Sequence, residues 1–518
     1  MYILTKFSFF GKKAPVLPTM TSEFHTVDNT GWYFSAYLLA QMACQPLVGR
    51  MLLFYDPKRC YMVSIILFEV GSILCATSPT SVVFIFGRAL AGCGAGGIVT
   101  ASIGIYGSSA PMRERPRGIA IIAVLQSISY FSGPILSGAI TESSLTWRFC
   151  FWINLPVGFV SLVAVFFVIK PRPSPHKHLP LREKFRKADP TGAALLTGSL
   201  VSLFLALEWG GTTLPFSSPQ VWGCFLSCGL LAAVFAVSQV LKKDNAVIPL
   251  RIFKQRTVAV CCLYSLLYGV ANIIHSSLLS TYFQTVQDVN ITMSGVYYVP
   301  RTLSSLIGSV ITGFTVTACG YYVPFLWAGP LFFLAGSVLL QHLGAESTMA
   351  QYLGYQTVVG FGFGVSIHMS IIAVQVVSSP EDMPLAAVME VFSGQLGGAV
   401  GASIGQNLFV GQLKRRLRMV VPSDEAEAFA SAGLTDMINS MKGFDVKTRE
   451  SFRLALSDAV TTAFIVPIVA TAAAAVVSWF VEWKTIDVSK PAAPKRSDVP
   501  TEASVNDTEK GTAKSSGT

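Results

Sequence analysis

The sequence has little charge. Asp, Glu, Lys and Arg make up 13% of its 518 residues, whereas about a quarter of an ordinary soluble domain is charged. Hydrophobic residues account for 52% of the chain. This composition excludes a soluble multidomain protein and predicts an all-α polytopic membrane protein. The net charge of +10 does not indicate nucleic-acid binding, because the basic residues cluster in short loops between apolar stretches.

The sequence also lacks the short motifs of common catalytic and metal sites. It contains no GxxxxGK[ST] phosphate-binding loop, which argues against ATP-driven pumping, and no HExxH helix. Its ten cysteines lie in or beside apolar stretches and form neither paired CxxC units nor a Cys/His ligand set. We therefore expect buried structural cysteines, no metal, no cofactor and no enzymatic activity.

What the sequence contains instead is a series of long apolar runs. A helix needs roughly 20 apolar residues to span a bilayer, and about thirteen runs meet this criterion. They lie near Trp32–Phe54, Cys60–Ala76, Ser81–Tyr106, Gly118–Ile140, Phe149–Ile169, Thr191–Leu207, Val221–Leu241, Val258–Leu279, Ser294–Val316, Val323–Leu343, Leu353–Val377, Leu385–Val410 and Val460–Phe480.

Lys and Arg gather in alternate loops, which are cytoplasmic by the positive-inside rule. These include the basic segment 171–190, and we expect the polar tail 482–518 to be cytoplasmic and disordered. The long loop 412–453 then lies outside, as does Asn290, which begins an Asn-Ile-Thr sequon and is a candidate glycosylation site. An odd number of spans with a cytoplasmic C-terminus places the N-terminus outside, or else one span is missing before Trp32.

The span Ser81–Tyr106 carries a permanent cation, Arg88, about a third of the way along. A charge at the centre of a spanning helix costs on the order of 2.5–3.5 kcal/mol, so such residues usually face a polar cavity. Gly92, Gly94 and Gly96 follow it and let another helix approach closely or slide. The pattern indicates a moving part beside a polar path. The alternative is a packing helix whose arginine only pairs with an acid.

The same glycine spacing follows Gln356 in the second half of the chain. The spacing predicts two parallel repeats, an arrangement with which transporters form one site at the bilayer midplane between two helical bundles.

The apolar runs also contain Glu69, Arg301 and Glu390. Ionisable groups inside a membrane are functional candidates, so we expect the two glutamates to carry protons; the alternative is that they are static partners of Arg88 and Arg301. Other polar residues are candidates for a substrate cavity, although each could instead make one interhelical hydrogen bond worth about 0.6 kcal/mol. They are Gln126, Asn272, His275, Gln356, His368 and Gln375.

Several stretches, in their order along the chain, resemble a known family. They include GWYFSAYLLAQMACQPLVGR (Gly31–Arg50), GRALAGCGAGG (Gly87–Gly97), GPILSGA (Gly133–Ala139), WRFCFWINLPVG (Trp147–Gly158), GYQTVVGFGFG (Gly354–Gly364) and QLGGAVGASIGQNLF (Gln395–Phe409). The chain is similar to fungal members of the major facilitator superfamily, in the branch of fourteen-span drug:H⁺ antiporters that includes toxin and secondary-metabolite efflux pumps.

The resemblance implies a major facilitator fold with two six-helix bundles, 32–170 and 242–481, and two extra central helices in 191–241. The segment 1–31 lacks the family's first helix, which normally bears an acid linked to proton coupling. The resemblance links Arg88 to proton transfer. It further assigns conformational gating to a cytoplasmic loop and to a helix break made by Gly133-Pro134, where proline removes a backbone hydrogen bond. The gating candidates are Gly49, Asp56, Lys58, Arg59, Gly92, Gly94, Gly96, Gly133, Pro134 and Gly138.

We therefore expect a monomeric, proton-coupled exporter of amphipathic drugs, fungal toxins or secondary metabolites, located in the plasma membrane. Its partners are the small-molecule substrate, protons and the bilayer. Two alternatives remain. One is a vacuolar importer of basic amino acids or similar solutes. The other is a non-transporting membrane protein, because the first helix is missing.

Overall fold

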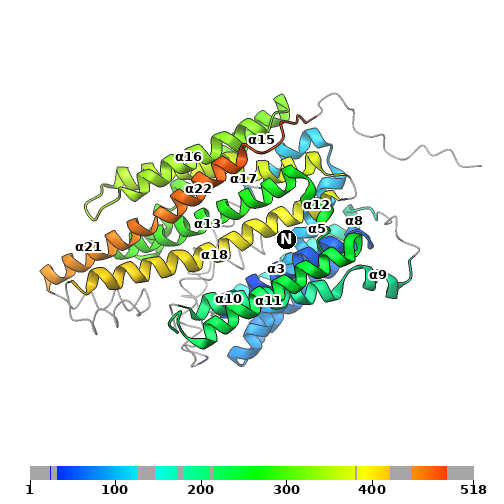
Figure 1. Ribbon diagram of the computed structural model, residues 1–518, viewed down its shortest axis with the longest axis horizontal. Helices are drawn as coiled ribbons and strands as arrows, with labels where there is room; N and C mark the ends of the chain where they lie inside the picture. The colour runs from blue at the N-terminus through cyan, green and yellow to red at the C-terminus, as the bar shows by residue number, and fades with distance from the viewer. Residues whose placement is uncertain are drawn as a thin grey trace, which may run out of the picture.

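The computed structural model describes residues 24, 32–122, 124–125, 128, 146–171, 179–210, 214–379, 382–419 and 445–486, and they form α-helices joined by short connections (Figure 1). The first half contains α3 (Trp32–Met51), α4 (Pro57–Thr77), α5 (Ser81–Ser109), α7 (Phe149–Trp152), α8 (Asn154–Val168), α9 (Leu181–Lys187), α10 (Pro190–Trp209) and α11 (Pro219–Lys242). The second half contains α12 (Leu250–Lys254), α13 (Arg256–Thr285), α14 (Ile291–Tyr297), α15 (Val299–Cys319), α16 (Val323–Gln341), α17 (Met349–Val377), α18 (Met383–Leu417), α21 (Val446–Ala463) and α22 (Ile465–Ser478).

Eleven helices in the described ranges are long and apolar enough to cross a membrane, and each coincides with an expected run. A further run, near Trp32–Phe54, forms the 20-residue helix α3, which is not among the eleven. The run near Gly118–Ile140 lies largely outside the described residues. The structure therefore confirms an all-α polytopic membrane protein.

Helix ends differ from the expected loop boundaries in two places. Helix α18 continues to Leu417 and α21 begins at Val446, so both ends of the expected loop 412–453 are helical. The expected basic loop 171–190 contains the seven-residue helix α9. Lys, Arg and Glu have high helix propensity and continue a helix beyond the bilayer, so an apolar run marks only the part of a helix inside the membrane.

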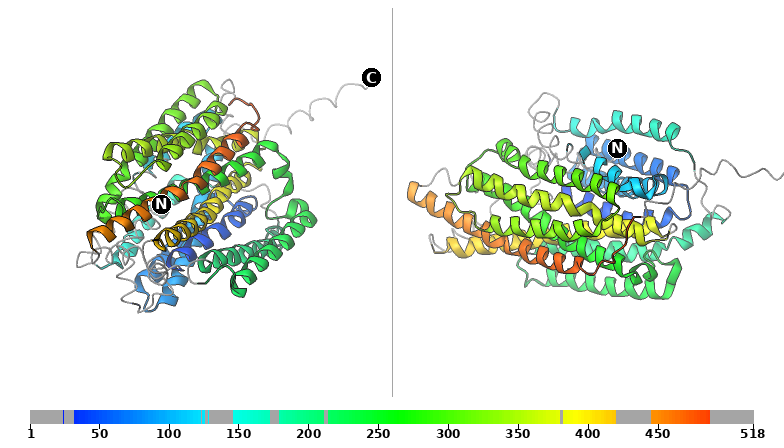
Figure 2. Two further views of the ribbon diagram at one scale, coloured as in Figure 1. Left: turned by 60° about the vertical axis from the view of Figure 1, so that its left-hand side comes forward. Right: turned by 90° about the horizontal axis from the view of Figure 1, so that it is seen from above.

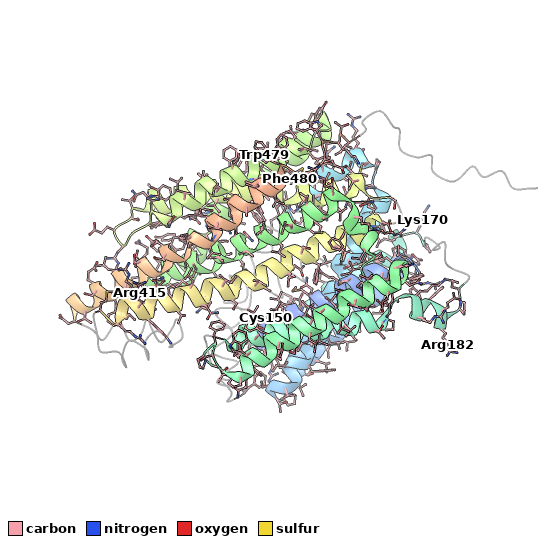
Figure 3. The ribbon with its side chains drawn as sticks, in the orientation of Figure 1. Cys150, Lys170, Arg182, Arg415, Trp479 and Phe480 are labelled. Carbon is pink, nitrogen blue, oxygen red and sulfur yellow. The ribbon has the colours of Figure 1, made fainter. Side chains whose placement is uncertain are left out.

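The helices form two bundles with a helical hairpin beside them (Figures 1 and 2). Helices α3, α4, α5 and α8 belong to the first bundle, and α13, α15–α18, α21 and α22 to the second. The hairpin packs through α10 on α3 and α18. Helix α11 contacts mainly α10, and its exposed Trp222, Leu226 and Leu230 are suited to contact with lipid. In Figure 3, Lys170 and Arg182 lie toward one end of the molecule and Arg415 lies toward the other, as expected for cytoplasmic and external residues.

The two halves repeat the same packing of glycine against backbone. A side chain added at any of four glycines would collide with the backbone of a neighbouring helix. The pairs are Gly92 with Tyr37, Gly96 with Gln41, Gly360 with Arg301, and Gly364 with Ser305. Helix α5 therefore packs on α3 as α17 packs on α15, which confirms the repeat seen in the sequence.

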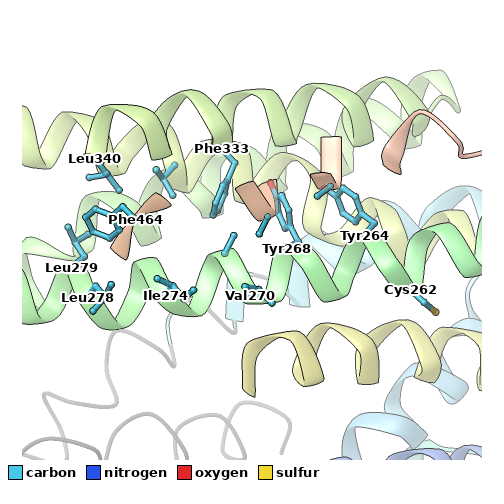
Figure 4. Close-up of a cluster of buried hydrophobic side chains, with 14 of the residues drawn as sticks. Cys262, Tyr264, Tyr268, Val270, Ile274, Leu278, Leu279, Phe333, Leu340 and Phe464 are labelled. Atoms are coloured by element: carbon cyan, nitrogen blue, oxygen red, sulfur yellow. The ribbon is translucent and has the colours of Figure 1, made fainter. Parts of the chain in front are cut away.

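Helix α13 runs through the apolar core of the second bundle (Figure 4). Tyr264 and Tyr268 stack on each other with ring centroids 5.0 Å apart, and Tyr268 also stacks on Phe363 of α17 at 5.6 Å. Phe333 of α16 lies 5.0 Å from the Tyr268 ring. Because these rings interlock, α13 is held at a fixed rotation, and so are the polar residues that it carries.

Asp189 anchors the α10–α11 hairpin at the end where α10 begins and α11 ends. It is 1% exposed and has a left-handed backbone with φ 56°. Its carboxylate pairs with Lys242 and accepts hydrogen bonds from Gly192 N at 2.9 Å and Val247 N at 3.2 Å. Burial acts to raise the pKa of Asp189, but hydrogen bonds from Lys242, Gly192 and Gln239 outweigh it and hold the pKa below its ordinary value.

We expect Asp189→Asn to destabilise the protein by about 1–3 kcal/mol at neutral pH, because the buried donors lose a charged acceptor. Since the folded-state pKa is depressed below 3.8, the stabilisation is complete above that value and is lost as the pH falls through the folded pKa. In melting curves of the detergent-solubilised protein recorded from neutral pH into acid, the difference between wild type and variant should therefore shrink as the pH falls below 3.8. Asp288→Asn, which removes an exposed pair with Arg449, is the control. Equal melting temperatures of wild type and Asp189→Asn at neutral pH would contradict this role.

Candidate functional site

Arg88 lies about two turns into α5 and is 2% exposed. Its Nε donates to the carbonyl of Tyr33 at 2.9 Å, and its Cζ lies 4.3 Å from the ring centroid of Tyr37. Both Nη atoms are buried and have no hydrogen-bond partner among the described residues. Arg88 thus presents two unsatisfied donors and a permanent charge inside the first bundle.

Gln356 takes the place of Arg88 in the second bundle. Its Nε2 donates to the carbonyl of Tyr297 at 2.6 Å, which repeats the bond from Arg88 to Tyr33. The cation of the second bundle is on α15 instead, where Arg301 occupies the position that Tyr37 has on α3. Each of these repeated helix pairs therefore carries a buried arginine, Arg88 on α5 in the first and Arg301 on α15 in the second.

Arg301 is 6% exposed and sits between α13 and α15. Its Nη2 donates to Asn272 Oδ1 at 2.6 Å, and its Nη1 donates to the hydroxyl of Tyr298. The Tyr298 hydroxyl in turn lies 2.6 Å from Ser276 Oγ. The buried Nε of Arg301 has no partner, and no carboxylate pairs with Arg301 within the part of the chain that the structure describes.

Glu390 joins three helices of the second bundle. It lies on α18, is 4% exposed, and its Oε1 accepts hydrogen bonds from Ser265 of α13 and Ser370 of α17, both at 2.5 Å. Ser265 and Asn272 are two turns apart on α13, roughly 10 Å at 1.5 Å per residue. Glu390 therefore lies toward the N-terminal end of α13 relative to Arg301 and is not in contact with it.

Glu69 lies on α4 and is half-buried where α4 packs on α8. Its carboxyl packs against Gly158 of α8, and both carboxyl oxygens are buried without a hydrogen-bond partner among the described residues. Among the described residues, Glu69 forms no ion pair with Arg88, and Glu390 forms none with Arg301. The static pairing considered from the sequence is thus not the arrangement in the structure.

The remaining candidates are dispersed. His275 is fully buried with its ring between Phe333 and Phe464, at 5.4 and 5.1 Å, so it belongs to the aromatic core. His368 is half-buried on α17. Asn290 caps α14 and accepts a hydrogen bond from Met293 N at 2.8 Å. Four candidates, Gln126, Gly133, Pro134 and Gly138, lie outside the described residues.

Arg115 joins the two bundles where α5 ends and α18 begins. It lies in the connection after α5, and its Nη1 is 3.0 Å from Met383 Sδ and 3.5 Å from Gln375 Oε1 of the second bundle. Its Nη2 donates a hydrogen bond to Gly107 O of the first bundle. Gln375, a candidate cavity residue, therefore takes part in this contact.

The expected gating loop lies next to this contact. Gly49 packs against Leu385 of α18, so the end of α3 faces the second bundle. Asp56 caps α4 by accepting from Lys58 N at 3.0 Å, and Lys58 Nζ donates to Phe166 O at 2.6 Å. Arg59 is exposed. Sequence reasoning singled out neither Arg115 nor Asp189, because charges in cytoplasmic loops are common and nothing in the pattern shows that these two are buried.

Known proteins match this chain over most of its length. The family model described as Major Facilitator Superfamily matches residues 1–402. The MFS-type transporter ltbE of Aspergillus luteorubrus is 38% identical, over 92% of this chain and 87% of the relative. The aspyridones efflux protein of Neocamarosporium betae is 33% identical, over 93% and 85%.

A solved structure that aligns with this chain shows the same fold. A crystal structure of a XylE variant aligns with a TM-score of 0.56 at 12% identity, covering 93% of this chain and 95% of that one. The described helices, the repeated packing of the two bundles and these relatives all indicate the same family. This chain belongs to the major facilitator superfamily of membrane transporters.

Proposed function

We propose that this protein exports amphipathic small molecules across the plasma membrane in exchange for protons. Two relatives have names that state efflux, the aspyridones efflux protein and efflux pump roqT of Penicillium rubens. These names support export of secondary metabolites. The observation that carries proton coupling is the set of membrane-embedded charges. Arg88, Arg301 and Glu390 are buried, and none forms an ion pair within the described residues. Such groups are rare in membranes and mark substrate or proton paths.

The contacts between the bundles support alternating access. Arg115 and Gly49 hold the cytoplasmic ends of the two bundles together. Bare backbone at Gly92 and Gly360 lets the helices within each bundle pack closely, so that each bundle can move as a unit. Rocking of one bundle against the other around a central site would then release substrate on one side after loading on the other.

Transport by reconstituted protein tests the proposal. Purified protein in vesicles with an acidic lumen is given dansyl-glycine, dansyl-glycinamide or ethidium outside. We expect at least one probe to accumulate above the level in empty vesicles, and nigericin, which collapses the proton gradient, to abolish that accumulation. Dansyl-glycine is especially informative, because a weak acid that crosses the bilayer passively leaves an acidic lumen. Absence of uptake of all three probes, with incorporation verified, would argue against export.

The membrane of residence needs a separate measurement. A fluorescent fusion examined together with plasma-membrane and vacuolar markers distinguishes them. Vacuolar residence would favour the solute-import alternative.

A further inference from the structure

The buried guanidinium groups of Arg88 and Arg301 have no carboxylate partner among the described residues. Arg88 lies over the ring of Tyr37 and Arg301 over that of Tyr298, at 4.3 and 5.1 Å. Cation–π contact offsets part of the cost of burying a guanidinium, by about 0.5–2 kcal/mol, but it does not neutralise the charge. The carboxylate of Glu390 is held by two serines roughly 10 Å farther along α13. Within the described residues, the surroundings of Arg301 therefore carry a positive charge without a neighbouring carboxylate.

The surroundings of Arg301 are suited to an anionic group. Arg301 has an unpartnered Nε, and the half-buried Asn272 uses its Oδ1 for the arginine, which leaves its amide N–H groups for another acceptor. The hydroxyls of Ser276 and Tyr298 share one hydrogen bond, so one of the two keeps its proton for a further acceptor. A carboxylate accepts several such hydrogen bonds at once and matches the planar fork of a guanidinium.

Aromatic rings lie beside this polar group. Tyr297 and Tyr298 are both half-buried, and the Tyr297 ring is 5.7 Å from Phe283 and 5.7 Å from Tyr352. A ligand that binds Arg301 through a charged group would thus have the half-buried Tyr297 and Tyr298 beside it, with Phe283 and Tyr352 buried behind Tyr297. This combination fits a molecule with one acidic group and a flat or apolar remainder.

We propose that the cargo is an amphipathic organic anion whose carboxylate, or an equally acidic phenol or enol, binds Arg301. This inference rests on the proposed export function and specifies its substrate class. A cationic cargo such as a basic amino acid would meet an unneutralised guanidinium, and like charges at close range repel strongly in a low-dielectric site. Export of an anion is also favoured by a membrane potential negative inside, by about 2.3 kcal/mol per charge at 100 mV.

The test compares a matched acid and amide. Dansyl-glycine and dansyl-glycinamide have almost the same size and differ by one charge. In vesicles with wild-type protein we expect a lower KM for the acid than for the amide. Arg301→Gln should reduce this preference by about 10- to 100-fold, as expected for loss of charge-assisted hydrogen bonds. Arg301→Lys should retain part of it, and Arg113→Gln, which alters an exposed loop arginine, should retain all of it.

The outcomes separate this inference from the proposed function. A wild-type protein that transports the amide or ethidium as well as the acid exports without charge selection, which would overturn the inference and leave export standing. The same holds if Arg301→Gln raises the KM for acid and amide equally, since Arg301 would then only support the fold. If inorganic anions rather than the cargo occupied this place, replacing chloride with gluconate would change transport of acid and amide alike. Transport of none of the probes would count against export itself.

Discussion

Arg88→Ala is expected to abolish gradient-driven export while the protein still reaches the membrane. The substitution removes the bond to Tyr33 O, the contact with the Tyr37 ring and the two Nη donors that point to no described partner. Charge-assisted hydrogen bonds are worth about 1.5–3 kcal/mol each, so losing even one that forms only during the transport cycle slows that cycle roughly 10- to 100-fold. An arginine kept with unsatisfied donors inside a membrane indicates a group that acquires its partner during function.

Two further variants sharpen this test. Arg88→Lys keeps the charge but loses the planar fork, and we expect it to recover only a minor part of the activity. Arg113→Ala removes an exposed arginine and should behave as wild type. The measurement is proton-driven uptake into vesicles, normalised to protein amount, with surface delivery assayed in cells. Wild-type uptake by Arg88→Ala would exclude Arg88 from coupling and leave it as a packing residue.

The sequence predicted which charges are embedded but not what they touch. Arg88, Arg301 and Glu390 stood out because an ionisable residue in an apolar run is unusual, and the structure buries all three. Their partners depend on the rotation of each helix about its axis, which hydrophobic runs without strong amphipathicity do not specify. Glu69 turns toward Gly158 of α8 and Glu390 toward two serines, so neither meets an arginine.

The repeat was the more informative signal. The shared glycine spacing after Arg88 and Gln356 predicted equivalent helices, and the bonds to Tyr33 O and Tyr297 O show that the equivalence extends to individual atoms. That Arg301 replaces Tyr37 in the second bundle could not be predicted, because α3 and α15 share few residue types. The burial of Asp189 and Arg115 could not be predicted for a different reason, because each contacts a segment distant in the chain. Asp189 accepts a hydrogen bond from Val247 N, and Arg115 contacts Met383.

Glu390→Gln is expected to separate substrate movement from the proton gradient. A glutamine can accept the same two hydrogen bonds from Ser265 and Ser370, so the packing of α13, α17 and α18 should be preserved. It cannot exchange a proton. If Glu390 carries the coupled proton, the variant should lose accumulation against a gradient but retain exchange of labelled for unlabelled substrate across the membrane, because exchange needs alternating access alone.

Both activities can be measured on one preparation. Uptake of dansyl-glycine into vesicles with an acidic lumen reports accumulation, and its efflux from preloaded vesicles with excess unlabelled compound outside reports exchange. Glu346→Gln, an exposed carboxyl in the connection after α16, is the matched control and should leave both unchanged. Ser265→Ala removes one of the two hydrogen bonds to Glu390, and we expect it to shift the pH at which accumulation is half-maximal without abolishing accumulation. If Glu390→Gln retains accumulation, the coupled proton is carried elsewhere, and Glu69 is the next residue to replace. If the variant loses exchange as well as accumulation, Glu390 supports the fold of the second bundle and does not transfer the proton.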